Sequence, residues 1–410
     1  MKKKLLFVTN DLNCDGASKS LLSLLEQIDY KNYDVDLLLF AHRGMFMNMI
    51  PKEVNVLPPI TPLKEITLPF TQSIGKLLSC GKWGLAYRRT RYLMNYYCGM
   101  SVAKAMQQVW PFYAQYVGVL KKEYDVAISY QDYWSKYFIA EKTVASKKLA
   151  WNHCNLSKVG MDIQFEEKYN KLIDYWITIS DECKDVLNSM FPDMLAKTYV
   201  IENIISPSVV RRMAIEDVPV MKENFSGCCI VTVGRLSHEK GIDLALDACL
   251  KLVQCGYDIR WYIIGEGKQK SELEKKIRKN NLQDRFILLG VHSNPYPFMK
   301  HAEIYVQPSR TEGKSIAIEE AKSLGKSIVV TNYQTVASQI VDMETGLISS
   351  ISGEGLFIRV RELLDKPELH NLFSINLDDY KGNESEIDKF YELIGREYYV
   401  TNSEYNSTCL

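Results

Sequence analysis

The chain has 410 residues, which is too long for one ordinary domain, so we expect two or three. Its 50 basic and 50 acidic side chains cancel, and a net charge of zero argues against nucleic-acid binding by the chain as a whole. The ten cysteines include no C-x-x-C pair, which predicts reduced thiols rather than a disulfide framework or a zinc site. No stretch approaches about 18 uninterrupted apolar residues, so we expect no membrane-spanning helix.

The N-terminal half alternates apolar runs with amphipathic stretches. Lysines precede the first apolar run, as in a signal peptide, but that run is too short and predicts a strand instead. Helices are expected to begin near residues 17 and 181, and buried strands at residues 5–9, 35–40, 126–129, 148–151 and 176–179. This alternation predicts an α/β domain with a doubly wound parallel sheet.

A glycine stands between the first predicted strand and the first helix. Gly16 would let a phosphate or a sugar approach the backbone at the helix N-terminus, although a plain turn also suits a glycine. Further on, Asp34 and Asp36 form an Asp-x-Asp sequence of the kind that can bind a divalent cation. Because it lies at the start of a predicted strand, we interpret it as strand-edge charge and infer no metal.

Residues 66–122 differ from the rest of the chain because they contain no Asp or Glu. Basic side chains, among them Lys82, Arg88, Arg89 and Arg91, are interleaved there with tyrosines and tryptophans. Such a segment suits an anionic membrane surface or an acceptor that carries a lipid diphosphate. A helical insertion that packs its aromatics inward explains the pattern equally well, and single-stranded nucleic acid explains it less well.

The C-terminal half repeats the alternation. Strands are expected at residues 229–233, 261–264, 286–289, 304–306 and 327–330, and helices at residues 242–253, 268–279, 315–324 and 336–341. The weakly periodic residues 207–226 are interpreted as a linker, residues 384–399 as a helix, and residues 401–410 as a frayed tail.

Two cations follow the first strand of this half. Arg235 and Lys240 lie five residues apart in a loop that opens a helix. Fixed cations and free N–H groups of a helix N-terminus stabilise negative charge, so the loop suits a departing diphosphate. A surface Arg/Lys pair is the plain alternative. Ligands of doubly wound sheets bind at the carboxyl ends of the strands, which predicts one cleft lined by residues 10–16, 153, 235–241, 265–267, 290 and 312–315.

Two carboxylates, Glu312 and Glu320, are separated by seven residues across a predicted loop-to-helix junction. Carboxylates accept hydrogen bonds from sugar hydroxyls, and the N–H groups of Ser315 and Ile316 at the helix start suit phosphate oxygens.

The helix pattern separates the neighbouring glutamates. Glu319 shares a face with Lys322 and Lys326, so we expect it to be solvated and paired with lysine. Glu320 lies on the flank of an expected apolar stripe, where a carboxylate must find a partner or face a cleft. The residues of that stripe are Ala317, Ala321 and Leu324.

The spacing of the two carboxylates resembles the glutamate-x7-glutamate motif of retaining nucleotide-sugar glycosyltransferases of family four, which have the two-domain glycosyltransferase-B fold. Residues 233–241, 264–267, 289–291 and 306–309 extend the resemblance through the second half. The chain departs from the family at Lys314 and Ser315, because the family often has Gly-Phe-Gly after the first glutamate.

The resemblance implies a role for each candidate residue. Arg235 and Lys240 would bind the donor diphosphate, and Val291 would lie near the base. Glu320 would bind the ribose, while Glu312 would bind hydroxyls of the donor sugar and act in catalysis.

On the opposite side of the cleft, the resemblance implies that His153 and Gly16 face the reacting carbon. His153 would be the second catalytic residue, although a lone histidine is more often structural.

The resemblance also implies a function: a retaining, metal-independent hexosyltransferase that needs no cofactor and uses a nucleotide sugar, with a UDP-sugar favoured. Its acceptor would be lipid-linked or an oligosaccharide, as in bacterial surface polysaccharide synthesis. We expect an acceptor domain at residues 1–206 with the basic insertion at about 66–122, and a donor domain at residues 207–375. Residues 376–410 would form a helix that returns to the first domain, followed by a tail. The expected location is cytoplasmic, peripheral at the inner face of an anionic membrane.

Two other functions stay open. A sugar-nucleotide epimerase or hydrolase on the same fold would need additional acid/base carboxylates in the cleft and no acceptor. A catalytically silent carbohydrate or lipid-phosphate binding protein stays open because of the departure at Lys314 and Ser315 and the single glycine at Gly16. The intact donor-site residues argue against it: Arg235, Lys240, Glu312 and Glu320.

Overall fold

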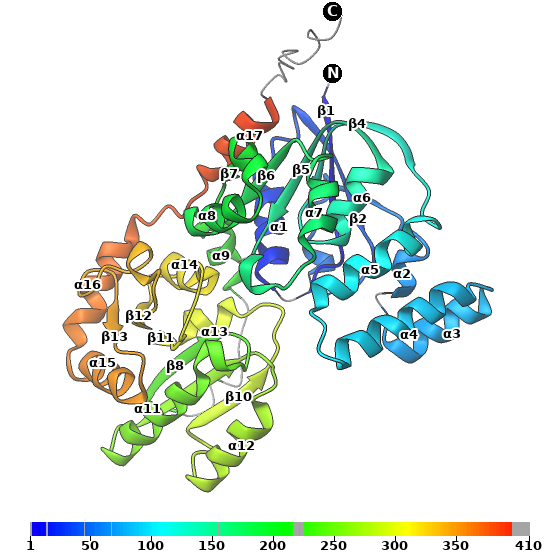
Figure 1. Cartoon of the computed structure of the whole chain (residues 1–410). Helices are drawn as coiled ribbons and strands as arrows, with labels where there is room; N and C mark the ends of the chain where they lie inside the picture. The colour runs from blue at the N-terminus through cyan, green and yellow to red at the C-terminus, as the bar shows by residue number, and fades with distance from the viewer. Residues whose placement is uncertain are drawn as a thin grey trace, which may run out of the picture.

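The computed structural model describes residues 2–13, 15–44, 46–66, 68–154, 156–215, 221 and 225–395 (Figure 1). These residues form two α/β domains, each with a parallel sheet, which confirms the predicted fold class. The predicted tail at residues 401–410 and the last residues of the predicted helix at 384–399 lie outside the described ranges.

The sheet of the first domain has the order β3-β2-β1-β4-β5-β6-β7. Its strands are β1 (Lys3–Thr9), β2 (Tyr33–Leu39), β3 (Asn55–Leu57), β4 (Leu120–Ser129), β5 (Thr143–Asn152), β6 (Tyr175–Thr178) and β7 (Thr198–Val200). The five strands expected here are present. The two edge strands, β3 and β7, have three residues each, too few for a periodic signal.

The helices of the first domain cover both faces of this sheet (Figure 1). They are α1 (Gly16–Gln27), α2 (Leu63–Ile66), α3 (Phe70–Ser79), α4 (Trp83–Tyr97), α5 (Val102–Ala114), α6 (Trp134–Lys142), α7 (Ile163–Asn170) and α8 (Asp181–Met190). The acid-free segment is thus helical, and α3 and α4 project from the body of the domain in Figure 1.

The sheet of the second domain has the order β10-β9-β8-β11-β12-β13. Its strands are β8 (Cys228–Val233), β9 (Ile259–Ile264), β10 (Phe286–Gly290), β11 (Ile304–Gln307), β12 (Ser327–Thr331) and β13 (Leu347–Ser349). The helices are α9 (Pro207–Met213), α11 (Ile242–Gln254), α12 (Lys270–Lys279), α13 (Tyr296–His301), α14 (Ile316–Ser323), α15 (Gly353–Asp365) and α16 (Pro367–Asp378).

Two expectations for this half are corrected. The predicted linker at 207–226 is wrong for its first seven residues, which form α9 and insert Val210 into the core of the second domain. The helix expected at 336–341 is only the short turn Val336–Ser338, because the chain leaves helical geometry at Gln339, whose side chain binds the backbone of Ser315.

The last described helix, α17 (Glu386–Gly395), returns to the first domain, as expected (Figure 1). Phe390, Leu393 and Ile394 are buried in the same apolar cluster as Leu5 and Phe7 of β1. A segment from the end of the chain therefore completes the core around its first strand.

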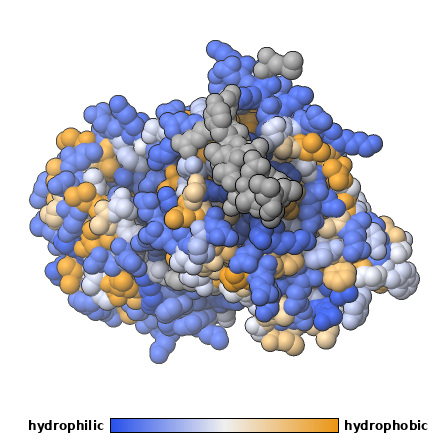
Figure 2. Space-filling view, turned by 45° about the horizontal axis from the view of Figure 1, so that its top comes forward, coloured by the Kyte–Doolittle hydropathy of each residue, from blue (hydrophilic) through white to orange (hydrophobic). Residues whose placement is uncertain are grey.

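On the face shown in Figure 2, apolar side chains are interspersed with hydrophilic ones. Among the described residues, no helix is both long and apolar enough to cross a bilayer.

Candidate active site

A cavity of about 990 Å³ lies between the two domains. Its first-domain wall is formed by the start of α1 and by the segments that follow β1, β4 and β5, and its second-domain wall by the segments that follow β8, β9 and β10 and by the start of α14. The carboxyl ends of both parallel sheets thus face the same space. It is lined by every candidate donor-site and catalytic residue: Gly16, His153, Arg235, Lys240, Val291, Glu312, Ser315, Ile316 and Glu320.

Glu312 is held in place by three donors from its own domain. Lys240 Nζ lies 2.5 Å from Glu312 Oε1, and Ser309 Oγ and Gln307 Nε2 reach the same oxygen at 2.6 and 3.0 Å. A carboxylate with three donors on one oxygen has a fixed orientation before any ligand arrives.

Lys240 owes its place to the turn that follows it. Gly241 has φ 62°, and a Cβ there would lie 2.0 Å from the carbonyl oxygen of Pro308. Only glycine fits, so the loop that carries Arg235 and Lys240 packs directly on the segment that leads to Glu312. Arg235 is exposed and lines the cavity beside them.

Glu320 faces the cavity, and its carboxylate is bonded to a residue of the opposite wall. Its Oε1 lies 2.7 Å from Lys19 Nζ of α1 and 2.8 Å from the Tyr296 hydroxyl of α13. Oε2 is buried and has no hydrogen-bond partner among the described residues. The first domain therefore holds one oxygen of this carboxylate, and the other is left for a ligand hydroxyl. Lys19 could not be found from local sequence patterns, because its partner is 301 residues away.

The start of α14 differs from expectation at Ser315. The Ser315 N–H donates to Gln339 Oε1 at 2.8 Å, and Gln339 Nε2 donates back to the Ser315 carbonyl at 2.9 Å. The Ser315 amide is thus not available to a phosphate in this state, and Ile316 is the next amide of the turn. Across the cavity, a Cβ on Gly16 would lie 3.0 Å from Ile316 Cδ1, so glycine permits this close approach.

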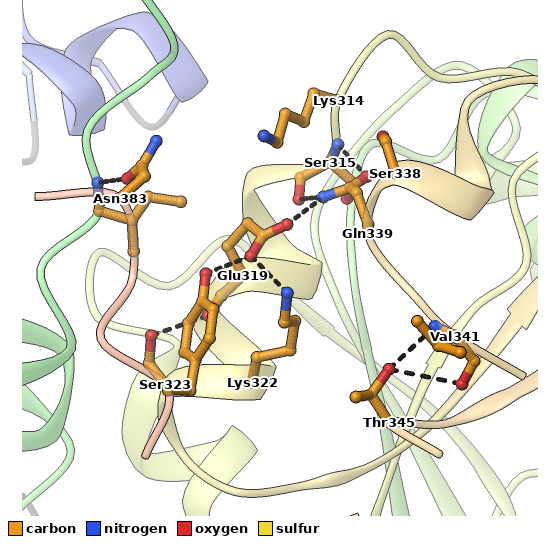
Figure 3. A network of polar contacts seen from close by, with 12 residues as sticks. Lys314, Ser315, Glu319, Lys322, Ser323, Ser338, Gln339, Val341, Thr345 and Asn383 are labelled. Atoms are coloured by element: carbon orange, nitrogen blue, oxygen red, sulfur yellow. Dashed lines mark hydrogen bonds and ion pairs between the residues drawn. The ribbon is translucent and has the colours of Figure 1, made fainter. Parts of the chain in front are cut away.

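Glu319 was expected to be solvated, and this is wrong. It is buried and contacts Lys322 at 3.1 Å, Gln339 Nε2 at 2.7 Å and the Tyr380 hydroxyl (Figure 3). The pairing with lysine is present, but the return segment covers the carboxylate. Lys326 does not share this contact, since its ammonium donates to the carbonyls of Lys300 and Ala302.

Lys314 stands at the departure from the family pattern. Its ammonium forms an ion pair with Glu202 in the crossover between the domains. Asn383 of the return segment also donates to Glu202, at 3.4 Å. The lysine therefore adds an ionic bridge between the domains to those of Lys19 with Glu320 and of Arg212 with Glu26.

The His153 ring is half-buried and packs against Tyr130 and Trp151. Nδ1 lies 3.1 Å from Asn203 Oδ1, and Nε2 has no hydrogen-bond partner in the described part of the chain. Burial lowers the pKa of His153 to about 4, so the imidazole is neutral at pH 7. With the proton on Nδ1, Nε2 can accept a hydrogen bond from a hydroxyl in the cavity.

Two residues of the cavity wall went unnoticed in the sequence. Asp132 follows β4 and accepts from Asn152 Nδ2 at 2.7 Å, and burial raises its pKa to about 6. Tyr133 beside it has φ 68°, an unusual conformation for a tyrosine. Both follow a predicted strand, so the rule that places ligands at strand ends would have found them.

The predicted strand-edge pair, Asp34 and Asp36, does not line the cavity. Asp36 is buried and accepts from Lys122, Tyr124 and Asn55 at 2.7, 2.6 and 2.9 Å. It is therefore a structural residue rather than an exposed edge charge. Over the described ranges, no group of three or more His, Cys, Asp or Glu side chains is placed to hold a metal ion.

The four basic residues singled out in the acid-free segment (residues 66–122) do not line one site. Arg89 lines the cavity, whereas Arg88 and Arg91 line a separate groove of about 230 Å³ and Arg88 stacks on Phe112. Lys82 precedes α4 outside both. The segment combines inward packing with large exposed aromatics, and its membrane role stays a prediction. Those aromatics include Trp83, Tyr87 and Tyr97, which are 69%, 62% and 78% exposed.

Comparison with known proteins identifies the second domain. Residues 223–377 match the family described as "Glycosyl transferases group 1". One relative is the N-acetylgalactosamine-N,N'-diacetylbacillosaminyl-diphospho-undecaprenol 4-alpha-N-acetylgalactosaminyltransferase of Campylobacter jejuni. The chain is 29% identical to it over 179 residues, and this aligned region covers 43% of the chain and 47% of the relative. It is 31% identical over 135 residues to the lipopolysaccharide core biosynthesis mannosyltransferase LpsB of Rhizobium meliloti, covering 31% and 37%. The matches span less than half of either relative.

The similarity of fold extends over both domains. The crystal structure of HepE from Anabaena in complex with UDP and glucose superposes with a TM-score of 0.66, at 15% identity, over 96% of this chain and 100% of that one. The two domains, each with a parallel sheet, the cavity between them and the return helix α17 therefore form the glycosyltransferase-B fold.

Proposed function

We propose that this chain, whose second domain belongs to the group 1 glycosyltransferases, moves a sugar from a nucleotide-sugar donor to an acceptor hydroxyl. The observation that carries the proposal is that six residues line one cavity. They are two cations, two carboxylates, a glycine that lets the opposite wall approach its backbone, and a neutral histidine. Those residues are Arg235, Lys240, Glu312, Glu320, Gly16 and His153.

The second domain would hold the donor. Arg235 and Lys240 neutralise the diphosphate, aided by the amide of Ile316 at the start of α14. The unpartnered oxygen of Glu320 accepts from a ribose hydroxyl, and the exposed side chain of Val291 packs near the base. The binding of UDP and glucose by HepE favours a UDP-sugar.

Glu312 would accept hydrogen bonds from the donor sugar while Lys240 keeps it oriented. We propose transfer with retention. The bond from the anomeric carbon to the diphosphate breaks as the bond to the acceptor oxygen forms on the same face, and the acceptor proton passes to the departing phosphate oxygen. Arg235 and Lys240 stabilise the charge of the leaving group, the task that a metal performs elsewhere, so the reaction would be metal-independent. His153 Nε2 would accept from a hydroxyl next to the reacting carbon.

The acceptor would be lipid-linked or an oligosaccharide, as in bacterial surface polysaccharide synthesis. The names of the two relatives support this, one with its diphospho-undecaprenol acceptor and the other with its lipopolysaccharide core. The exposed Trp83, Tyr87 and Tyr97 of α4 support a cytoplasmic protein that rests on the inner face of an anionic membrane.

The first test is binding and hydrolysis of UDP-, GDP-, ADP- and TDP-sugars without added metal. One sugar nucleotide should bind saturably, and Arg235→Ala should abolish that binding. Arg278→Ala, an exposed arginine of α12, is the matched control and should bind as the wild type does. Absence of binding across the panel by folded protein would refute the donor site and leave a silent binding protein.

A second candidate, a sugar-nucleotide epimerase or hydrolase, is favoured by one observation. Asp132 lines the cavity with a pKa near 6 and would supply the additional acid/base carboxylate that such chemistry needs. Product analysis separates the two. Turnover that requires an acceptor supports a transferase, whereas epimerised or hydrolysed sugar at the same rate without acceptor supports the second candidate.

A further inference from the structure

The first-domain end of the cavity is an aromatic and apolar chamber that none of the donor roles uses. Its wall is formed by the inner face of α4, the end of α2 and part of α5. The whole cavity, at about 990 Å³, is at the upper limit of the ~300–1,000 Å³ that single-ligand pockets span, so a second ligand has room beside the donor. The residues of the chamber are Phe40, Ile66, Arg89, Tyr92, Met106 and Trp134.

Helix α4 presents two different faces. Leu85, Arg89 and Tyr92 are spaced at i, i+4 and i+7, so they share the inner face, and the last two line the cavity. Trp83, Tyr87 and Met94 lie on the opposite face and are exposed. The acid-free segment therefore directs one cation inward while its apolar surface points out.

Arg89 is the cation of the chamber, and no described residue forms an ion pair with it. Its Cζ lies 5.9 Å from the ring centroid of Phe70 and 5.2 Å from that of Tyr92. Its Nε is buried without a hydrogen-bond partner in the described part of the chain. A guanidinium held by aromatic rings with an unused donor is prepared for an anion, because such a donor costs free energy until it is satisfied.

The aspartates on the first-domain wall of the cavity are engaged elsewhere. On the cavity wall, Asp11 is paired with Arg43 at 3.0 Å, Asp15 caps α1 through the Ser18 N–H, and Asp132 accepts from Asn152. Glu65 of α2 and Arg89 act in opposite directions on the pKa of Tyr113, which Glu65 raises and Arg89 lowers. No ion pair within 4.0 Å joins these two residues, and Glu65 Oε2 is buried without a hydrogen-bond partner among the described residues.

We propose that Arg89 binds a phosphate group of the acceptor, and that Ile66, Tyr92 and Met106 pack against an apolar chain attached to that phosphate. The proposal rests on the transferase function above and adds the chemical class of the acceptor, a phosphorylated lipid. A guanidinium matches phosphate through paired N–H groups, and the apolar wall requires an apolar part of the same molecule.

The test is calorimetric binding of farnesyl diphosphate, below its micelle concentration, to the full chain saturated with UDP. UDP occupies Arg235 and Lys240, so the probe reports the second site. Wild type should bind, Arg89→Gln should bind about tenfold more weakly or worse, and Arg89→Lys should recover part of the loss. Arg91→Gln, on the same helix outside the cavity, should stay within about twofold, the spread expected for a solvated charge.

Farnesol and inorganic pyrophosphate separate the two parts of the ligand. Both should bind at least about tenfold more weakly than farnesyl diphosphate, because each lacks one of the two interactions. Pyrophosphate binding as tightly as farnesyl diphosphate would refute the apolar wall, and equal losses in Arg89→Gln and Arg91→Gln would refute the role of Arg89. If UDP binds but farnesyl diphosphate does not, the inference fails and the transferase stands; if UDP itself fails to bind, the transferase fails.

Discussion

On the second-domain wall of the cavity, the two glutamates accept hydrogen bonds from the protein, three at Glu312 and two at Glu320. On the first-domain wall, Nε2 of His153 and Nε of Arg89 are buried without a partner among the described residues. The glutamates of one wall are thus oriented before any ligand arrives, although Glu320 Oε2 has no hydrogen-bond partner among the described residues. On the other wall, both of these nitrogens are left for a ligand to satisfy. The difference suits a donor with fixed geometry and an acceptor whose binding completes the site.

The sharpest test of the oriented wall is Lys240→Ala. It removes a cation from the diphosphate and one of the three donors to Glu312. We expect kcat/KM to fall about 10²- to 10³-fold in an assay of sugar transfer. Lys251→Ala, on α11 in an exposed pair with Glu354, should keep full activity. A loss below about tenfold would mean that Lys240 does not act on the leaving group.

The outer face of α4 extends the comparison beyond the cavity. Trp83→Ser with Tyr87→Ser should weaken binding to phosphatidylglycerol-containing vesicles by about tenfold, because two large apolar groups leave the surface. The free energy of unfolding should change by less than about 0.5 kcal/mol, since both side chains are exposed. Leu195→Ser, an exposed leucine away from α4, should bind vesicles as the wild type does in a flotation assay. Unchanged vesicle binding by the double variant would refute the proposed membrane role of this face.

Lys19 joins the two walls of the cavity through its ion pair with Glu320. Its removal tests whether this ion pair affects nucleotide binding at Glu320. A ribose at Glu320 competes with the ion pair to Lys19, and Lys19→Ala should therefore bind UDP about two- to fivefold more tightly in calorimetry. The exposed Lys31→Ala, just after the same helix, should leave the affinity unchanged. Weaker binding by Lys19→Ala would instead indicate that Lys19 contacts the nucleotide.

The smallest effect concerns pH and the buried imidazole. Because burial lowers the pKa of His153 from 6.5 to about 4, the unfolded chain binds more protons than the folded one between these values. The stability that neutral His153 contributes is complete above pH 6.5 and is lost as the pH falls toward 4.

The melting temperature of His153→Gln should therefore fall less than that of the wild type between pH 7 and pH 5. The imidazole carbon-bound protons in NMR should titrate near pH 4. Titration near pH 6.5 would show that the ring is solvated and would remove its proposed role as an acceptor.

The sheets and the donor loop could be predicted because their signals are local. Buried parallel strands appear as continuous apolar runs, and Arg235, Lys240, Glu312 and Glu320 stand at fixed distances from strand ends. Lys19 and Gln339 could not be predicted, since each acts on a residue brought near only by the fold.

Glu319 and Arg89 show what helical periodicity can and cannot predict from the sequence. The spacing correctly paired Glu319 with Lys322, but it could not foresee that Tyr380 would bury the carboxylate. For Arg89 the information was present: Leu85, Arg89 and Tyr92 share one face of a helix. Grouping the four cations by charge alone concealed the one that points into the cavity.

The return of α17 to the first sheet fixes the order in which a new chain can be finished. As synthesis proceeds, β1 leaves the ribosome first, yet Leu5 and Phe7 receive Phe390 and Leu393 only when the end of the chain emerges. The second domain, continuous from α9 to α16, can fold before then. A chain that stops after α16, or is cut between Asp378 and Glu386, should retain a folded second domain beside a first domain with an open core. Premature termination would thus yield a chain that captures sugar nucleotides without using them.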